Sequence, residues 1–179
     1  MSAPEIQTER LTLRGFRPED WRGLARFYGD DAVMRHMLPG RGLPPKDAEQ
    51  RAKSNIHNFN ESWRERGYGV WAVTTREGSH LIGQCGLRFV PEAYDGSGAV
   101  ELLYLLNKTH WGKGLASEAA RAAVRHAFDA TTLPALFAIT APQNSGSRGV
   151  LRKLGFQEQG MRVLWERDVL WHDLDKPIS

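Results

Sequence analysis

The sequence has a single cysteine, Cys85, among 179 residues, and one thiol cannot form an internal disulfide. No apolar run approaches the roughly 20 residues that a membrane-spanning helix needs. The segment from Met1 to Glu5 has no basic residues followed by an apolar stretch, so a secretory signal is not expected. These absences predict a cytoplasmic protein with no membrane partner.

The chain also has little excess of either charge, since 24 basic and 21 acidic residues leave a net charge of +3. The basic residues are spread along the chain, with no run of five or more. Nucleic-acid binders gather such residues on one face or stripe, so nucleic acid is not expected as the main partner. Neither an H-x-x-x-H nor a C-x-x-C pattern occurs, which predicts no metal site.

What is present is the composition of a globular protein, with 41% hydrophobic and 25% charged residues. At roughly 150 residues per domain, the length predicts one domain over residues 1–179. Loops rich in proline or glycine are expected at 38–45 and 91–98. Apolar periodicity predicts the following elements: strands 10–16, 68–74, 81–89, 100–106, 135–141, 158–163 and 165–171, and helices from 18, from 48 to 67, from 116 to 129 and from 145.

The run of strand 100–106, helix 116–129 and strand 135–141 predicts a parallel strand pair with a helical crossover. Its first loop reads H-W-G-K-G-L-A-S over residues 110–117 and opens the helix. The two glycines allow a close backbone approach, the first helical amides point at the ligand, and Lys113 adds positive charge. The loop therefore predicts a phosphate-bearing ligand, with a plain glycine-rich turn as the alternative.

Two common nucleotide motifs do not fit this loop. A P-loop needs glycine at 107 and Ser or Thr after Lys113, where Asn107 and Gly114 stand. A dinucleotide fingerprint needs a third glycine at 117, where Ser117 stands.

Three segments taken in order point to one family. They are T-E-R-L-T-L-R over 8–14, V-E-L-L-Y-L over 100–105 followed by G-K-G-L-A-S-E-A over 112–119, and Asn144 with Ser147 followed by V-L-R-K-L-G-F over 150–156. Together they resemble the GNAT acyltransferase superfamily, in its Rim-type branch of ribosomal-protein N-terminal acetyltransferases. The resemblance implies an α/β (α+β) fold. Its mostly antiparallel, twisted sheet would have six to seven strands, a central parallel β-α-β pair and about four helices.

The resemblance also implies acetyl-CoA as cosubstrate and an amine as acceptor. Backbone amides near Leu105 and Leu106 would bind the pantetheine arm and polarise the thioester carbonyl. Amides of 112–117 would hold the pyrophosphate, and Asn144 and Ser147 would lie near the thioester sulfur. The implied cofactor-binding set is Leu105, Leu106, Trp111, Gly112, Lys113, Gly114, Leu115, Ala116, Ser117, Asn144 and Ser147.

Three positions depart from the pattern of that superfamily. Trp111 stands where the signature has Gln or Arg, although tryptophan is familiar there in the Rim-type branch. Leu151 stands where many members have a tyrosine that acts as general acid, so a proton donor at this position is not available. Leu103 stands where the branch often has glycine.

Glu101 is the only carboxylate in the apolar strand 100–106. Primary amines are largely protonated at pH 7, so transfer needs a base, and Glu101 is predicted to act as one through water. The alternative is a solvent-facing edge position, or an ion pair with Arg88 or another basic residue on a neighbouring strand. Ser147 is predicted as acid to the leaving thiolate, or else as a hydrogen-bonding hydroxyl. Tyr104 is either a proton donor or a core residue.

The predicted function is acetyl-CoA-dependent N-acetyltransfer to a primary amine, on a protein N-terminus or on a small molecule such as an amino acid, polyamine or aminoglycoside. Cys85 lies in a buried-looking strand, which favours direct transfer in a ternary complex over an acetyl-enzyme. The alternative function is a non-catalytic acyl-CoA-binding sensor or interaction module. A homodimer is common in the branch that the chain resembles, so a homodimer is an expectation here.

Overall fold

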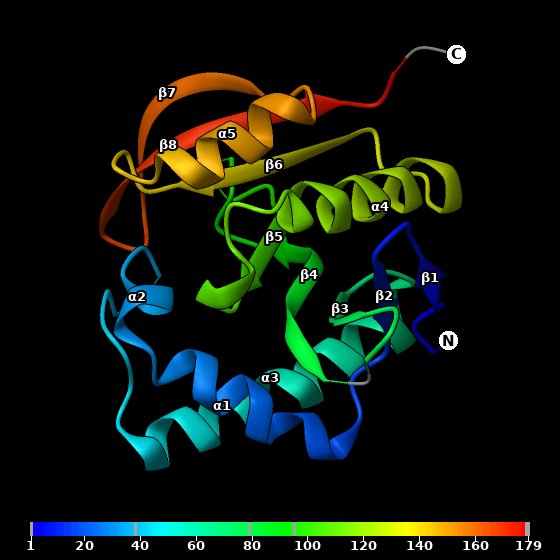
Figure 1. Ribbon diagram of the computed structural model, residues 1–179. Helices are drawn as coiled ribbons and strands as arrows, with labels where there is room; N and C mark the ends of the chain where they lie inside the picture. The colour runs from blue at the N-terminus through cyan, green and yellow to red at the C-terminus, as the bar shows by residue number, and fades with distance from the viewer. Residues whose placement is uncertain (1, 38, 79, 95, 178–179) are drawn as a thin grey trace.

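The computed structural model describes residues 2–37, 39–78, 80–94 and 96–177, and is built on one eight-stranded sheet with the order β1-β2-β3-β4-β5-β6-β8-β7. Helices cover both faces of this sheet (Figure 1). The strands are β1 (Ile6–Gln7), β2 (Leu11–Arg14), β3 (Val70–Thr75), β4 (Leu81–Val90), β5 (Ala99–Leu106), β6 (Ala135–Thr140), β7 (Gln157–Leu164) and β8 (Arg167–Asp175). The helices are α1 (Trp21–Tyr28), α2 (Asp31–Met34), α3 (Pro45–Arg66), α4 (Leu115–Ala130) and α5 (Ser145–Lys153), with short 3-10 turns η1 (Pro18–Asp20) and η2 (Lys108–His110).

Neighbouring strands pair antiparallel except β5 and β6, which are parallel as the β-α-β pattern predicts. β5 pairs with β4 in eight register positions, from Val90 opposite Ala99 to Gly83 opposite Leu106. By contrast, β5 and β6 are joined in the described residues only where Glu101 faces Phe137. The β5 residues after Glu101 therefore have no ladder partner in β6 among the described residues.

Alternation along β5 divides its side chains between two helical layers. Leu102 and Leu106 pack into the core beneath α4, which also holds the alanines on the buried side of that helix. Leu103 and Leu105 face the other core, which α1 and α3 cover. Glu101 precedes Leu103 by two residues and therefore lies on this second face. The sheet thus separates an α4–α5 layer from an α1–α3 layer (Figure 1).

The expected fold class is confirmed, but the expected six to seven strands and about four helices are too few. The two-residue β1 and the four-residue α2 are too short to produce a readable period. The boundary near 165 was also misplaced, because Trp165 and Glu166 form the turn between β7 and β8 with φ of 49° and 58°. Of the two predicted loops, Leu38 and Asp95 lie outside the described residues.

None of the helices in the described residues has the length and apolar character needed to cross a membrane.

Candidate functional site

The glycine loop before α4 presents backbone donors to open space. Gly112 and Gly114 have φ of 72° and 76°, in the left-handed region that favours glycine. A Cβ added at Gly112 would meet nothing within 4 Å, and one at Gly114 would meet only Arg10 Nη2 at 3.6 Å. Gly114 caps α4 without a side-chain hydrogen bond, and the first intrahelical bond runs from Glu118 N to Gly114 O at 3.1 Å. The preceding amides have no intrahelical acceptor, which makes the loop fit a phosphate.

A clamp from the N-terminal strands holds this loop from outside. The Glu118 carboxylate accepts hydrogen bonds from Thr8 Oγ1 at 2.6 Å and Arg10 N at 2.8 Å, and it pairs with the Arg10 guanidinium. Arg10 Nη1 also donates to Lys113 O at 2.9 Å. Sequence reasoning missed this function of Arg10 and Glu118. The signal lay in the T-E-R run and in the glutamate that follows the loop, but their pairing spans 108 residues.

The end of β5 lies beside the loop. Leu105 and Leu106 are buried, in the part of β5 for which the described residues of β6 supply no ladder partner. Trp111 is half exposed, and its Nε1 donates to Leu106 O at 2.8 Å. This contact ties the loop to the strand whose amides are predicted to bind pantetheine.

The first turn of α5 contacts β5 through Tyr104. Asn144 caps α5, with its Oδ1 accepting from Ser147 N at 3.1 Å. Ser147 Oγ lies 2.7 Å from Tyr104 Oη, and Tyr104 Oη also donates to Ser147 O at 3.1 Å. Burial raises the pKa of Tyr104, so its phenol stays protonated at neutral pH. The structure therefore brings Asn144, Ser147 and Tyr104 together, with Tyr104 able to donate a proton.

Glu101 lies on the opposite face of β5, where 4% of its surface is exposed. Both Arg88 Nε, at 3.0 Å, and Arg88 Nη2 donate to its Oε2, so the ion pair considered as an alternative is present. Oε1 accepts no hydrogen bond from the described part of the chain. Burial raises the pKa of Glu101, and Arg88 opposes that rise. Because β5 lies between β4 and β6, the alternative of an exposed edge position is wrong.

The Arg88 guanidinium also lies over the Trp165 ring, 5.1 Å from its centroid. Trp165 belongs to the β7–β8 turn, so this contact brings the end of that hairpin to Glu101. The neighbouring Arg167 Nη1 donates to Met37 O at 3.4 Å, in the segment between α2 and α3. The hairpin end therefore bridges the sheet and the helical layer beside the buried carboxylate.

Cys85 lies on β4 and is fully buried in the α4-side core. Burial raises the pKa of its thiol well above the ordinary value, so the thiolate is scarce at neutral pH. A thiol in this state is a poor nucleophile.

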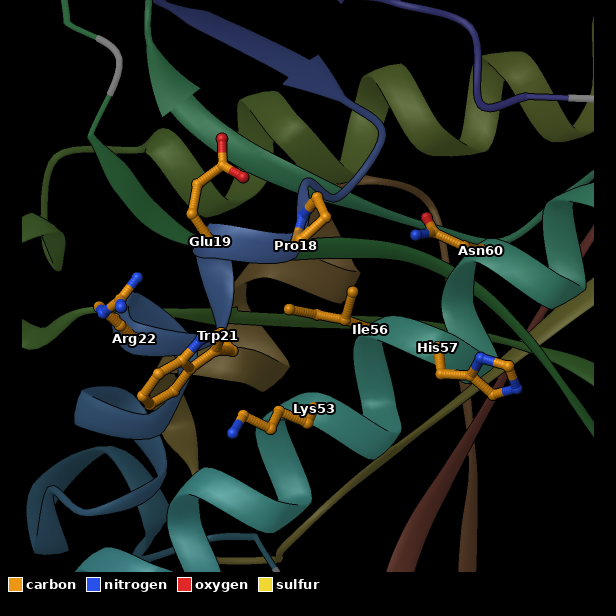
Figure 2. A pocket seen from close by; sticks show the side chains of 8 residues that line it. All are labelled: Pro18, Glu19, Trp21, Arg22, Lys53, Ile56, His57 and Asn60. Atoms are coloured by element: carbon orange, nitrogen blue, oxygen red, sulfur yellow. The ribbon is translucent and has the colours of Figure 1, made fainter.

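Two hollows of about 630 Å³ each lie along α3, away from these residues. Figure 2 shows the first, between η1, α1 and α3, with Lys53 beside Trp21. Neither hollow is lined by any residue predicted for the site. No three His, Cys, Asp or Glu side chains gather as metal ligands within the residues that the structure describes.

Known proteins resemble this chain in sequence and in fold. Residues 10–157 match the family model described as an acetyltransferase (GNAT) domain. An uncharacterized N-acetyltransferase, p20, from Bacillus licheniformis is 30% identical over 162 residues, which cover 90% of this chain and 87% of the relative.

Solved structures show the same fold. An acetyltransferase from Agrobacterium tumefaciens superposes with a TM-score of 0.80 and 26% identity, covering 97% of this chain and 95% of its own. A ribosomal L7/L12 α-N-protein acetyltransferase in complex with coenzyme A has a TM-score of 0.71 and 14% identity, covering 96% and 98% of the two chains.

Proposed function

Because the chain belongs to the GNAT acetyltransferase family, we propose that it transfers the acetyl group of acetyl-CoA directly to a primary amine within a ternary complex. One observation carries the proposal. After Glu101, β5 has no ladder partner in β6 among the described residues, which supports pairing of its backbone with a pantetheine arm. Glu101 lies on one face of β5 and the Tyr104–Ser147 pair on the other, so both are candidates for handling protons.

In this proposal the pyrophosphate of acetyl-CoA lies on the amides of 112–117, with Lys113 adding positive charge. The pantetheine arm runs along β5, where amides near Leu105 and Leu106 bind it as an added strand would. The thioester then lies near Ser147, because the first turn of α5 contacts β5 through Tyr104. Asn144 supports this end by fixing the start of α5.

Glu101 is proposed to take the proton of the acceptor amine, through Oε1 and a water molecule. The amine nitrogen then bonds to the carbonyl carbon while β5 amides stabilise the charge on the carbonyl oxygen. The carbon–sulfur bond breaks, and the thiolate receives a proton from the Ser147 hydroxyl, which Tyr104 can replenish. Holding both substrates in one complex supplies the orientation that this reaction needs.

The acceptor is proposed to be an α-amine at a protein N-terminus or on a small molecule. The Rim-type resemblance and the neighbour described as a ribosomal-protein acetyltransferase support the first. A sensor that only binds acyl-CoA would have no use for a buried carboxylate next to the part of β5 that has no partner in β6.

The test is calorimetric titration of acetyl-CoA into wild type and Gly114→Glu. The variant places bulk and negative charge on the proposed pyrophosphate site, so micromolar binding should be lost. Gly67→Glu is the matched control, because Gly67 ends α3 with φ of 72°, close to the 76° of Gly114, and a Cβ added there meets nothing within 4 Å. The control should lose similar stability and keep binding. No binding by folded wild type, or equal loss in both variants, would remove the proposal.

A further inference from the structure

Arginines from three strands share the sheet face that carries Glu101. Arg88 lies opposite Glu101 in the β4–β5 register. In the β7–β8 register Arg162 faces Val169 and Arg167 faces Leu164, so both arginines alternate onto the side of Trp171. The Trp171 ring stacks on Phe137 at 4.4 Å between centroids.

Phe137 in turn lies opposite Glu101 in the β5–β6 register. Arg88, Arg162 and Arg167 therefore belong to the same face as the proposed base.

Most carboxylates around this face already form ion pairs or accept hydrogen bonds. Glu101 pairs with Arg88, and Asp173 accepts from Trp171 Nε1 at 2.7 Å and from Tyr94. On the helical side, Asp30 pairs with Lys108 at 3.0 Å and caps α2.

Three further acids lie in the α2 segment and at the β7–β8 turn. Asp31 accepts from Gly42 N at 2.8 Å. Asp168 alternates onto the opposite face, with Leu170. Glu166, in the exposed β7–β8 turn, makes no ion pair with the described residues. Among the described residues of the Glu101 face, Arg88 has a carboxylate partner in Glu101, whereas Arg162 and Arg167 make no ion pair.

The hairpin end lies next to the Glu101–Arg88 pair, because Arg88 lies over the ring of Trp165, two residues before Arg167. The Arg88 side chain is 46% exposed although it pairs with a buried carboxylate. Arg167 bonds to a neutral carbonyl, that of Met37, so its charge is not neutralised there. Figure 1 shows the β7–β8 turn coming down beside α2, on the side of the α1–α3 layer.

We propose that the acceptor is a primary amine that carries a carboxylate near the amine, and that Arg167 binds this carboxylate. The inference rests on the proposed transferase function and adds the substrate class to it. An arginine fork binds a carboxylate through two parallel hydrogen bonds, which would aim the amine at Glu101. A polyamine or aminoglycoside would instead bring like charge toward the arginines, which is unfavourable. The carboxylate is either the α-carboxylate of an amino acid or an acidic side chain near a peptide N-terminus.

The first experiment compares peptide amides that begin with serine and continue with two glutamates, two glutamines or two lysines. Free glutamate and its α-amide separate the amino-acid source from the peptide source. Both kcat/KM for acetylation and the Kd for the CoA-loaded protein are measured. Acidic acceptors should exceed their neutral counterparts by about tenfold in both quantities, the scale of one charge-assisted pair.

Arg167→Gln should abolish that preference, whereas Arg125→Gln, on the exposed side of α4, should leave it intact. Equal values for glutamate and glutamine peptides, or a preference for the lysine peptide, would overturn the inference, as would binding of none of them. The two proposals fail separately. Turnover without an acidic preference rejects the substrate class alone, and Arg167-dependent binding without any acetyl transfer rejects the transferase function alone.

Discussion

The Arg10 guanidinium and the Glu118 carboxylate lie 2.7 Å apart and join the residues before β2 to the first turn of α4. The pair is partly exposed, and exposed ion pairs alone contribute little to stability. Its importance lies in position, because Arg10 also donates to Lys113 O within the glycine loop. Partial burial raises the pKa of Glu118, but hydrogen bonds from Thr8 and Arg10 outweigh it and hold that pKa below its ordinary value. The Glu118 carboxylate is therefore ionised at neutral pH.

Replacing Arg10 with glutamine should weaken acetyl-CoA binding by about tenfold, the scale of one lost hydrogen bond involving a charged group. The physical reason is that the loop amides lose their fixed direction while Glu101 and Ser147 are untouched. The KM for acetyl-CoA should rise and kcat at saturation should stay within about twofold, as expected for a loss of uniform binding. Arg76→Gln is the control, because Arg76 contacts Thr8 O but no loop residue. Equal KM values in the two variants would contradict a positioning function for Arg10.

Glu101→Gln should lower kcat by roughly 10²–10³-fold, within the range for loss of a general base. Acetyl-CoA affinity should stay unchanged, because the side chain faces away from the glycine loop and the Tyr104–Ser147 pair. In wild type the activity should rise with pH through the raised pKa of Glu101, since only the carboxylate accepts a proton. The measurement is a kcat/KM profile with pH for both proteins. A variant with wild-type turnover would reject the assignment.

The same raised pKa has an opposite effect on stability. Because burial makes the folded-state pKa of Glu101 higher than the unfolded one, folding favours the protonated acid. Stability from this group is present below the unfolded pKa and is lost as pH rises through the folded one. Glu101→Gln should therefore gain thermal stability relative to wild type between acidic and neutral pH, measured by melting curves. A purely structural Arg88–Glu101 pair would instead lose stability in the variant at neutral pH.

The cofactor loop could be predicted from the sequence because its determinants are local. Two glycines, a lysine and a helix start follow one another within a few residues, and the flanking strands show clear apolar periods. Arg88 could likewise be considered as a partner for Glu101, because the two residues fall in successive predicted strands. The contacts that the sequence did not predict join residues that are far apart along the chain. Tyr104 and Ser147 are 43 residues apart, and their contact joins β5 to the first turn of α5.

The Arg167–Met37 contact spans 130 residues and depends on where a turn ends rather than on any pattern. The position of Trp165 in the β7–β8 turn, where a strand is expected from residue 165, also depends on where that turn lies. Its left-handed backbone conformation is uncommon for a bulky residue and has no sequence signal of its own.

Tyr104→Phe and Ser147→Ala should each lower kcat by about 10–100-fold, and the double variant should lose little more. The reason is that the two hydroxyls form one hydrogen-bonded unit, so removing either one breaks proton delivery to the thiolate. Single-turnover acetyl transfer in the four proteins measures the coupling. Tyr68→Phe is the control, because it removes a phenol hydroxyl beside Arg66 instead. Losses that multiply in the double variant would show that the two groups act independently.

Cys85→Ala should keep turnover within about twofold of wild type. The buried thiol has a raised pKa and lies in the core beneath α4, so it cannot serve as the acceptor of an acetyl group. Removing it should cost stability by roughly 1 kcal/mol, the scale of one buried group lost from a core. Initial rates at several fixed concentrations of each substrate should give intersecting reciprocal plots. Parallel plots together with an inactive variant would establish an acetyl-cysteine intermediate and overturn direct transfer.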